Sequence, residues 1–146
     1  MKCYIAADHA GIALKDEVKK WLEAQHIAFE DLGTFDTQRV DYPLYAQKLA
    51  QRVLADSAYG ILICGSGIGM SIAANRFAGI RAALCHDAYT AEVARLHNDA
   101  NVLCLGARVL GGGIVESILH VFFQTTFEGG RHEKRIALID AIQTKE

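Results

Sequence analysis

The segment with the clearest chemical potential is a run of closely spaced glycines, Gly65-Ser66-Gly67-Ile68-Gly69, which directly follows the apolar stretch 59–64. Glycines let backbone N–H groups approach a ligand closely, and at the start of a helix these donors and the helix dipole favour negative charge. The run therefore predicts a turn that binds a phosphate or an oxyanion. The alternative is a tight strand-to-helix turn without a ligand, which the spacing alone does not exclude.

Cys64 stands immediately before these glycines, at the carboxyl end of the apolar stretch. Backbone donors that hold an anion also stabilise a thiolate, so this cysteine is a candidate base. We expect Cys3, Cys85 and Cys104 to be buried strand residues; Cys85 also ends an apolar stretch, but no glycine run follows it. The four cysteines form no C-x-x-C pair, and neither a zinc site nor a disulfide framework is expected.

Ionisable side chains follow the other apolar stretches as well. They are Asp8 and His9 after residues 3–7, His86 and Asp87 after residues 80–85, and Arg108 after residues 101–105. If the stretches are parallel strands, their carboxyl ends meet at one edge of a sheet, and these side chains converge on Cys64. His97 and Asn98 end a predicted helix instead, and need a separate reason to reach that edge.

Arg131 and Arg135 are four residues apart in a predicted helix and share one face of it. Two guanidinium groups bind a phosphate bidentately, which a single lysine cannot do. His132 lies between them and Arg108 elsewhere, which favours a phosphate site. The alternative is a solvated charged turn.

Helix-like and strand-like segments alternate along the chain. Strands are predicted at 3–7, 27–32, 59–64, 80–85 and 101–105, and helices at 11–25, from Pro43 to 56, at 70–77, 88–98, 114–127 and 131 to about 144. In the first helix, Leu14 and Val18 form an apolar stripe, and Lys15 and Lys19 are assigned to the surface. The alternation predicts an α/β fold: a Rossmann-like, doubly wound, five-stranded parallel sheet with helices on both faces.

Size and composition narrow the possible functions. The chain has 146 residues and 51% hydrophobic residues, which suits a single domain spanning 1–146. A net charge of −2 gives no general attraction for nucleic acid or membrane, so neither partner is expected. Asp8 comes too early for a signal peptide, so a cytoplasmic location with reduced thiols is expected. Because the predicted helix 114–127 is apolar on most sides, we expect a second subunit to cover part of it; packing within the chain is the alternative.

Taken in order, these residues resemble the sugar-phosphate isomerase family that contains ribose-5-phosphate isomerase type B and the subunits of galactose-6-phosphate isomerase. The resemblance covers essentially the whole chain. The matching blocks are Ala7-Asp8-His9-Ala10-Gly11, Asp41-Tyr42-Pro43, Ile63 to Gly69, Ile72-Ala73-Ala74-Asn75, Phe77 to Ala82, His97 to Leu103 and Gly129-Gly130-Arg131-His132.

The resemblance implies an aldose-ketose isomerase that interconverts ribose 5-phosphate and ribulose 5-phosphate through a cis-enediolate. It makes Cys64 the base, because Met70 stands where some relatives place a glutamate base. It implies no cofactor and no metal. The other roles that it implies are enediolate binding by the N–H groups of Gly65, Gly67, Ile68 and Gly69, hydrogen bonding or proton relay by Ser66, ring opening by His97 with Asp8, sugar-oxygen binding by Asn98, and phosphate binding by His9, Arg108, Arg131 and Arg135.

The resemblance also implies a site shared within a homodimer, or a dimer of dimers, in which His97 and Arg108 of one chain reach Cys64 of the other. A six-carbon substrate, allose 6-phosphate or galactose 6-phosphate, stays open because pocket depth decides it. A dinucleotide-binding module is the main alternative, since Gly65 and Gly67 precede Asp87 by about 20 residues. Two details count against this alternative. The third glycine is at position 69 rather than 70, and the turn follows the third predicted strand. A non-catalytic subunit is less favoured because Cys64 and Asp8 are both present.

Overall fold

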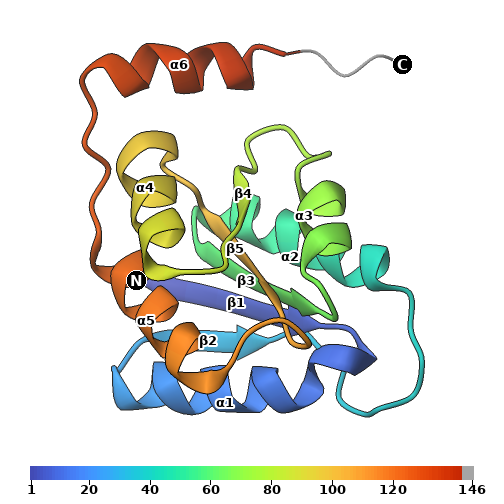
Figure 1. The fold of residues 1–146 in the computed structure, drawn as a ribbon. Coiled ribbons are helices and arrows are strands. Elements are labelled where there is room, and N and C mark those ends of the chain that lie inside the picture. The colour runs from blue at the N-terminus through green and yellow to red at the C-terminus, as the bar shows by residue number, and fades with distance from the viewer. Residues whose placement is uncertain (143–146) are drawn as a thin grey trace.

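The computed structural model describes residues 1–142 and contains one five-stranded sheet in the order β2-β1-β3-β5-β4, with every pair parallel (Figure 1). The strands are β1 (Lys2–Ala7), β2 (Ala28–Asp31), β3 (Tyr59–Cys64), β4 (Ala82–Leu84) and β5 (Val102–Gly106). The helices are α1 (Ile12–Ala24), α2 (Tyr42–Asp56), α3 (Ile68–Ala74), α4 (Ala88–Asn98), α5 (Gly112–Gln124) and α6 (Arg131–Asp140), with a short 3-10 turn, η1 (His9–Gly11). The predicted fold class is confirmed.

Helices cover both faces of the sheet and divide its core in two. Side chains of β1 alternate between the layers: Ile5 packs with α1, α4 and α5, and Tyr4 packs with α2 and α3. Strand β3, at the centre, is buried on both sides, as its continuous apolar run predicts. Helix α6 lies apart from these two layers, next to the end of α4 (Figure 1).

The strand order reverses between β1 and β3, since the chain adds β2 on one side of β1 and β3 on the other. Ala7 is paired with Ile63 at the carboxyl ends of these two strands, and Cys64 is paired with Gly106 of β5. A reversal of strand order opens a crevice at the carboxyl ends, where ligands of such sheets bind. The sheet therefore places Asp8 and the glycine turn on the two sides of one crevice.

Packing within the chain covers most apolar side chains of helix 114–127, and the expectation that a second subunit covers part of this helix stays a prediction. The helix spans Gly112–Gln124, and its own chain buries Val115, Ile118, Leu119 and Phe122. Phe123 packs on Trp21 of α1 with ring centroids 5.9 Å apart. Packing within the chain is therefore the main cover of this helix, although Ile114 stays 47% exposed.

The assignment of Lys15 to the surface is wrong. Its side chain is 2% exposed, and its Nζ lies 2.8 Å from Oδ1 of Asp31, while Lys19 reaches the other carboxylate oxygen at 2.9 Å. Burial alone raises the pKa of Asp31, but hydrogen bonds from Lys15, from the Gly33 N–H and from Lys19 outweigh it and lower that pKa. This ion pair fixes α1 to the edge strand β2.

Several predicted boundaries shift by a few residues. Helix α3 begins at Ile68 rather than Met70, because Gly67 takes a left-handed conformation (φ 79°) directly before it. Strand β4 is limited to Ala82–Leu84, and α6 ends at Asp140. Residue 144, the predicted end of the last helix, lies outside the described residues.

Candidate active site

Asp8 is fixed at the crevice by the turn that follows β1. Its side chain is buried (6% exposed) and accepts a hydrogen bond of 2.9 Å from the Ala10 N–H, and its own N–H donates to the Ile63 carbonyl. The turn packs directly on β3 because residue 11 is glycine: a β-carbon there would lie 2.8 Å from Cγ2 of Ile63. Asp8 is therefore hydrogen-bonded to Ile63, the residue that precedes Cys64 at the end of β3.

His9, the next residue, is oriented by the loop that precedes α2. The Val40 N–H donates to Nδ1 of His9 at 3.2 Å. Since Nδ1 accepts this bond, the proton of the neutral ring lies on Nε2. Nε2 is thus an N–H donor, which suits an anionic ligand.

Cys64 is 5% exposed and turns toward the glycine turn. Its Sγ accepts a hydrogen bond from the Gly67 N–H at 3.1 Å. This is the contact that the sequence predicted between the thiol and the donors of the turn. Met70, at the place of an alternative glutamate base, is fully buried in the α2–α3 core.

The glycine turn keeps donors available for an anion. The Ile68 N–H donates to Oγ of Ser66 at 3.2 Å. Among the described residues, the N–H groups of Ser66 and Gly69 have no acceptor in the protein. Strand β5 closes on the turn from behind, where a β-carbon on Gly106 would lie 2.6 Å from the Ser66 carbonyl oxygen.

Arg108 lies against this same turn. Its N–H donates to the Gly65 carbonyl at 2.9 Å, and a β-carbon on Gly65 would lie 3.0 Å from Nη1 of its guanidinium. The structure therefore corrects the expectation that Arg108 reaches Cys64 from another subunit: it reaches the turn of its own chain. We call Asp8, His9, residues 64–69 and Arg108 the carboxyl-edge group.

Tyr42 is a neighbour of this group to which the sequence interpretation gave no role. A β-carbon on Gly69 would lie 2.5 Å from the Tyr42 ring, so the ring rests directly on the backbone at the start of α3. Tyr42 is 37% exposed at the first turn of α2. In the sequence, Tyr42 could have been identified as a site residue from its place in the Asp41-Tyr42-Pro43 block, which carries part of the family resemblance.

His97 and Asn98 lie at the opposite edge of the sheet. Helix α4 runs back from the carboxyl edge, so His97 and Asn98 at its end come next to the start of β4 and β5. The Asn98 carbonyl accepts a hydrogen bond of 2.9 Å from Nε of Arg81, the residue before β4. Within one chain, His97 therefore does not reach Cys64. Its predicted place at the end of a helix already indicated this.

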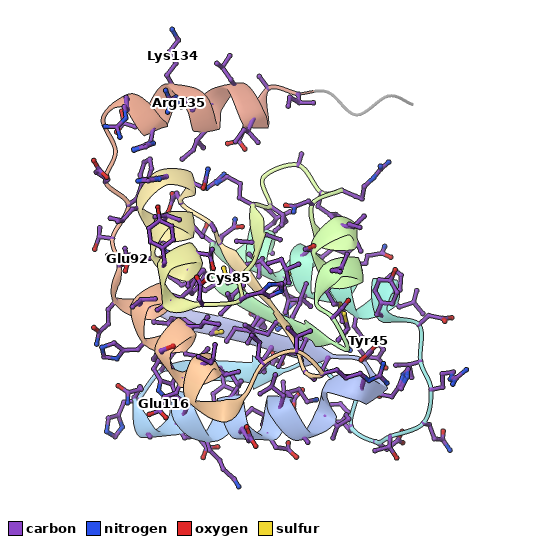
Figure 2. The ribbon with its side chains drawn as sticks, viewed as in Figure 1. Tyr45, Cys85, Glu92, Glu116, Lys134 and Arg135 are labelled. Carbon is purple, nitrogen blue, oxygen red and sulfur yellow. The ribbon has the colours of Figure 1, made fainter. Side chains whose placement is uncertain are left out.

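Arg131 and Arg135 join His97 through helix α6. The Glu128 N–H donates to the Leu96 carbonyl, and the His132 ring stacks on His97 with centroids 4.3 Å apart. Both arginines are exposed on α6, where Figure 2 labels Arg135. We call His97, Asn98, Arg131 and Arg135 the α4–α6 group.

Glu128 and His132 were missed as neighbours of His97. The Nε2 atoms of both histidines lie near Oε2 of Glu128, at 4.0 Å for His97 and 3.9 Å for His132. Burial, the cation of Arg131 and then His97 lower the pKa of His132. His132 was noted between the arginines, but no feature of the sequence marked Glu128.

The other cysteines fit a structural role. Burial raises the pKa of the Cys85 thiol to about 11, and it raises the pKa of the Cys3 and Cys104 thiols further still. These three side chains are fully buried or nearly so. All four cysteines have free thiols in the structure.

A cavity of about 380 Å³ at the amino edge of the sheet is lined by Arg81 and Arg95, among others. Their guanidinium groups are already engaged: Arg95 donates to Asp99 at 2.9 Å and to the Ala100 carbonyl at 2.7 Å, and Arg81 donates to the Asp99 carbonyl. We interpret this cavity as structural. None of the helices within residues 1–142 is long and apolar enough to cross a membrane.

Comparisons with known proteins match both the sequence and the fold. Residues 3–139 match the family model described as Ribose/Galactose Isomerase. Ribose-5-phosphate isomerase B of Escherichia coli is 43% identical over 145 residues, which cover 99% of this chain and 97% of that protein.

Two solved structures have closely similar folds. Ribose 5-phosphate isomerase from Thermotoga maritima has a TM-score of 0.94 at 50% identity, covering 97% of this chain and 98% of that one. Ribose-5-phosphate isomerase B from Mycoplasma genitalium, solved with bound ribulose-5-phosphate, has a TM-score of 0.90 at 40% identity, covering 95% and 93%. The family match and these relatives confirm the resemblance: the chain belongs to the ribose/galactose isomerase family.

Proposed function

We propose that this chain interconverts ribose 5-phosphate and ribulose 5-phosphate. The relatives from E. coli and M. genitalium carry that activity in their names, and the second was solved with ribulose-5-phosphate. The observation that carries the proposal is the contact between Sγ of Cys64 and the Gly67 N–H, in the crevice that also holds Asp8. It supports a thiolate base beside unpaired backbone donors.

The proposed reaction begins with opening of the sugar ring, in which His97 and Asp8 transfer the protons. The thiolate of Cys64 then removes the proton from C2, and the electron pair of the broken C–H bond forms the C1–C2 double bond of a cis-enediolate. The negative charge moves to O1, where the N–H groups of Ser66 and Gly69 stabilise it. The Ser66 hydroxyl relays a proton from O2 to O1, and return of the proton from Sγ to C1 gives the ketose.

Phosphate binding falls to the cationic and N–H donors of the two groups. His9 offers Nε2–H, and Arg108 lies beside the glycine turn. Arg131 and Arg135 stand one helical turn apart on one face of α6, so both guanidinium groups can bind the same phosphate. Because no catalytic step needs a redox or metal centre, we propose that the reaction uses no cofactor.

The placement of the two groups supports an active site built from two chains. His97 lies at the edge of the sheet opposite Cys64, so ring opening and proton transfer meet in one pocket only if a second chain brings its α4–α6 group to the crevice. Exposed apolar side chains on α3 (Ile68 and Ile72) and on α6 (Leu138 and Ile139) support such a dimer. We propose that each chain acts as one domain spanning 1–146, with its C-terminal helices in the dimer interface.

Removal of the thiol tests the proposed base. Cys64→Ala is expected to abolish isomerisation of ribose 5-phosphate while inorganic phosphate still binds in a calorimetric titration. Cys85→Ala is the matched control, since it removes a thiol that burial keeps protonated, and it should retain turnover. Full activity of Cys64→Ala would refute the assignment.

The substrate itself needs a separate assay. The family description includes galactose as well as ribose, and the two sugar phosphates differ by one carbon, which a pocket discriminates by about 1–3 kcal/mol. Parallel assays with ribose 5-phosphate, allose 6-phosphate and galactose 6-phosphate should give the highest kcat/KM for the ribose compound. The unpaired cysteines fit our proposal that the protein works in the cytoplasm.

A further inference from the structure

His97, Glu128 and His132 form a cluster of three side chains whose chemistry the proposed reaction leaves partly unused. One ligand atom from each lies within 4.8 Å of the other two. The cluster joins three segments: the end of α4, the turn after α5 and the start of α6. Two imidazole nitrogens and one carboxylate oxygen are the ligand set typical of three-ligand zinc sites that keep an open fourth position.

The backbone holds these segments together independently of any ligand. The Glu128 N–H donates to the Leu96 carbonyl at 3.1 Å, which ties the turn to α4. Gly129 and Gly130 then both adopt positive φ values, 73° and 58°, which reverse the chain and return it to α4 at His132. The ligand atoms are therefore brought together by the fold.

His132 has an unsatisfied nitrogen that faces this cluster. Its side chain is 6% exposed, its Nε2 lies 3.9 Å from Oε2 of Glu128, and this atom has no hydrogen-bond partner within residues 1–142. A buried polar atom without a partner destabilises the folded protein. A cation bound to Nε2 would satisfy it.

We propose that His97, Glu128 and His132 bind a divalent transition-metal ion of the Zn²⁺ class. Ligand atoms around tetrahedral Zn²⁺ lie about 3.3 Å apart, so the observed separations of 4.0 and 3.9 Å must contract by about 0.6–0.7 Å. The planes of the two rings are inclined to each other by 13°. In this stacked arrangement their nitrogen lone pairs point in parallel directions rather than toward one ion. His97, with 39% of its side chain exposed, rotates out of the stack to bind, and the buried His132 stays in place.

Nearby charges set the strength of this site. The Glu128 carboxylate attracts the ion, whereas Arg131 and Arg135 on α6 repel it. We therefore expect a dissociation constant in the micromolar range, about −8 kcal/mol, rather than the nanomolar range of closed structural sites. Because the ligand set contains no cysteine, the cysteine spacing along the chain carried no information about it.

Metal binding at this place has a consequence that rests on the proposed function. His97 is the residue assigned to ring opening, and a lone pair bound to Zn²⁺ is no longer available to the sugar. Bound metal should therefore inhibit the isomerase in competition with the sugar phosphate.

The test titrates the purified full-length protein with Co²⁺ and Zn²⁺. Co²⁺ should give the visible absorption of a tetrahedral site, displaced by Zn²⁺ at one ion per chain. His132→Gln and Glu128→Gln should each weaken Zn²⁺ binding at least tenfold in calorimetry. His120→Gln, at an exposed histidine of α5, is the matched control, and it and Cys64→Ser should bind as the parent does. Glu128 is 48% exposed, so Glu128→Gln leaves the core intact. This variant tests the site even if His132→Gln fails to fold.

Three results would overturn the site: no binding up to millimolar Zn²⁺, unchanged binding in Glu128→Gln, or loss of binding in Cys64→Ser, which would place the metal on the thiolate. If the metal binds as expected but the parent protein isomerises no sugar phosphate, the proposed function fails and the metal site stands. If the parent is active and Zn²⁺ inhibits it equally in Glu128→Gln, the inhibitory consequence fails.

Discussion

Replacement of Gly106 by alanine tests whether the position of the glycine turn matters for turnover. Gly106 ends β5 beside Cys64, and the added β-carbon would lie 2.6 Å from the Ser66 carbonyl oxygen and 2.8 Å from its carbonyl carbon. Both are backbone atoms, so no side-chain rotation relieves the contact. To reach an ordinary contact of 3.4 Å, Ser66 must move by about 0.8 Å, away from β5.

The loss of turnover should be measurable at 25 °C, whereas the loss of stability should be too small to unfold the protein at that temperature. Misplacement of catalytic groups by about 1 Å lowers rates by up to about 100-fold, which is about 2.7 kcal/mol of transition-state stabilisation. Crowding of one methyl group destabilises a fold by about 1–3 kcal/mol. For a chain of this size that lowers Tm by roughly 3 °C per kcal/mol, so the variant stays folded at 25 °C.

The assay compares kcat for ribose 5-phosphate in Gly106→Ala with kcat in Gly113→Ala. Gly113 lies in the first turn of α5, and a β-carbon there meets nothing within 4 Å. Alanine at this position should keep full activity and raise stability by up to about 1 kcal/mol. Wild-type kcat in a folded Gly106→Ala protein would show that the position of the turn does not limit the reaction.

Three further predictions concern stability and the two groups of site residues. Lys15→Met removes the buried partner of Asp31 and should cost about 3 kcal/mol in urea unfolding. In the parent protein, the lowered pKa of Asp31 adds stability above about pH 4 that is lost as the pH falls below it. Unfolding at a series of pH values should show a weaker dependence on acid pH in Lys15→Met, in which Lys19 and the Gly33 N–H still bind Asp31. A mixture of inactive Cys64→Ala and His97→Asn, refolded together, should recover roughly a quarter of the parent rate because half of the random dimers carry one intact site; no recovery would contradict a site shared between chains. Arg135→Ala should chiefly raise KM, as loss of uniform phosphate binding does, and a loss confined to kcat would argue against that role.

Local patterns predicted much of the fold. Strand β3 and helix α4 have the predicted bounds, because a continuous apolar run bounded by Gly65 and a helical stripe that starts after Asp87 are unambiguous. Helix α5 shows the limit of prediction from local patterns. Its apolar residues do not indicate whether α1 and α4 or another chain cover them. Lys15 was misplaced for a similar reason, since its burial depends on an acid sixteen residues away in β2.

The candidate site was predictable where neighbours in sequence are neighbours in space. The contact of Cys64 with Gly67 spans three residues, and Asp8 follows from the order of the strands. The link from His97 to Glu128 and His132 depends instead on the path of the chain after α5, which reverses at two glycines. No periodicity in the sequence encodes that return.

The most direct test of the central claim, that Cys64 is the base of an aldose-ketose isomerase, is proton exchange followed by NMR in D₂O. The parent protein should convert ribose 5-phosphate to ribulose 5-phosphate and incorporate solvent deuterium at C1, and Cys64→Ala should do neither. Exchange at C1 that persists in Cys64→Ala would contradict the account.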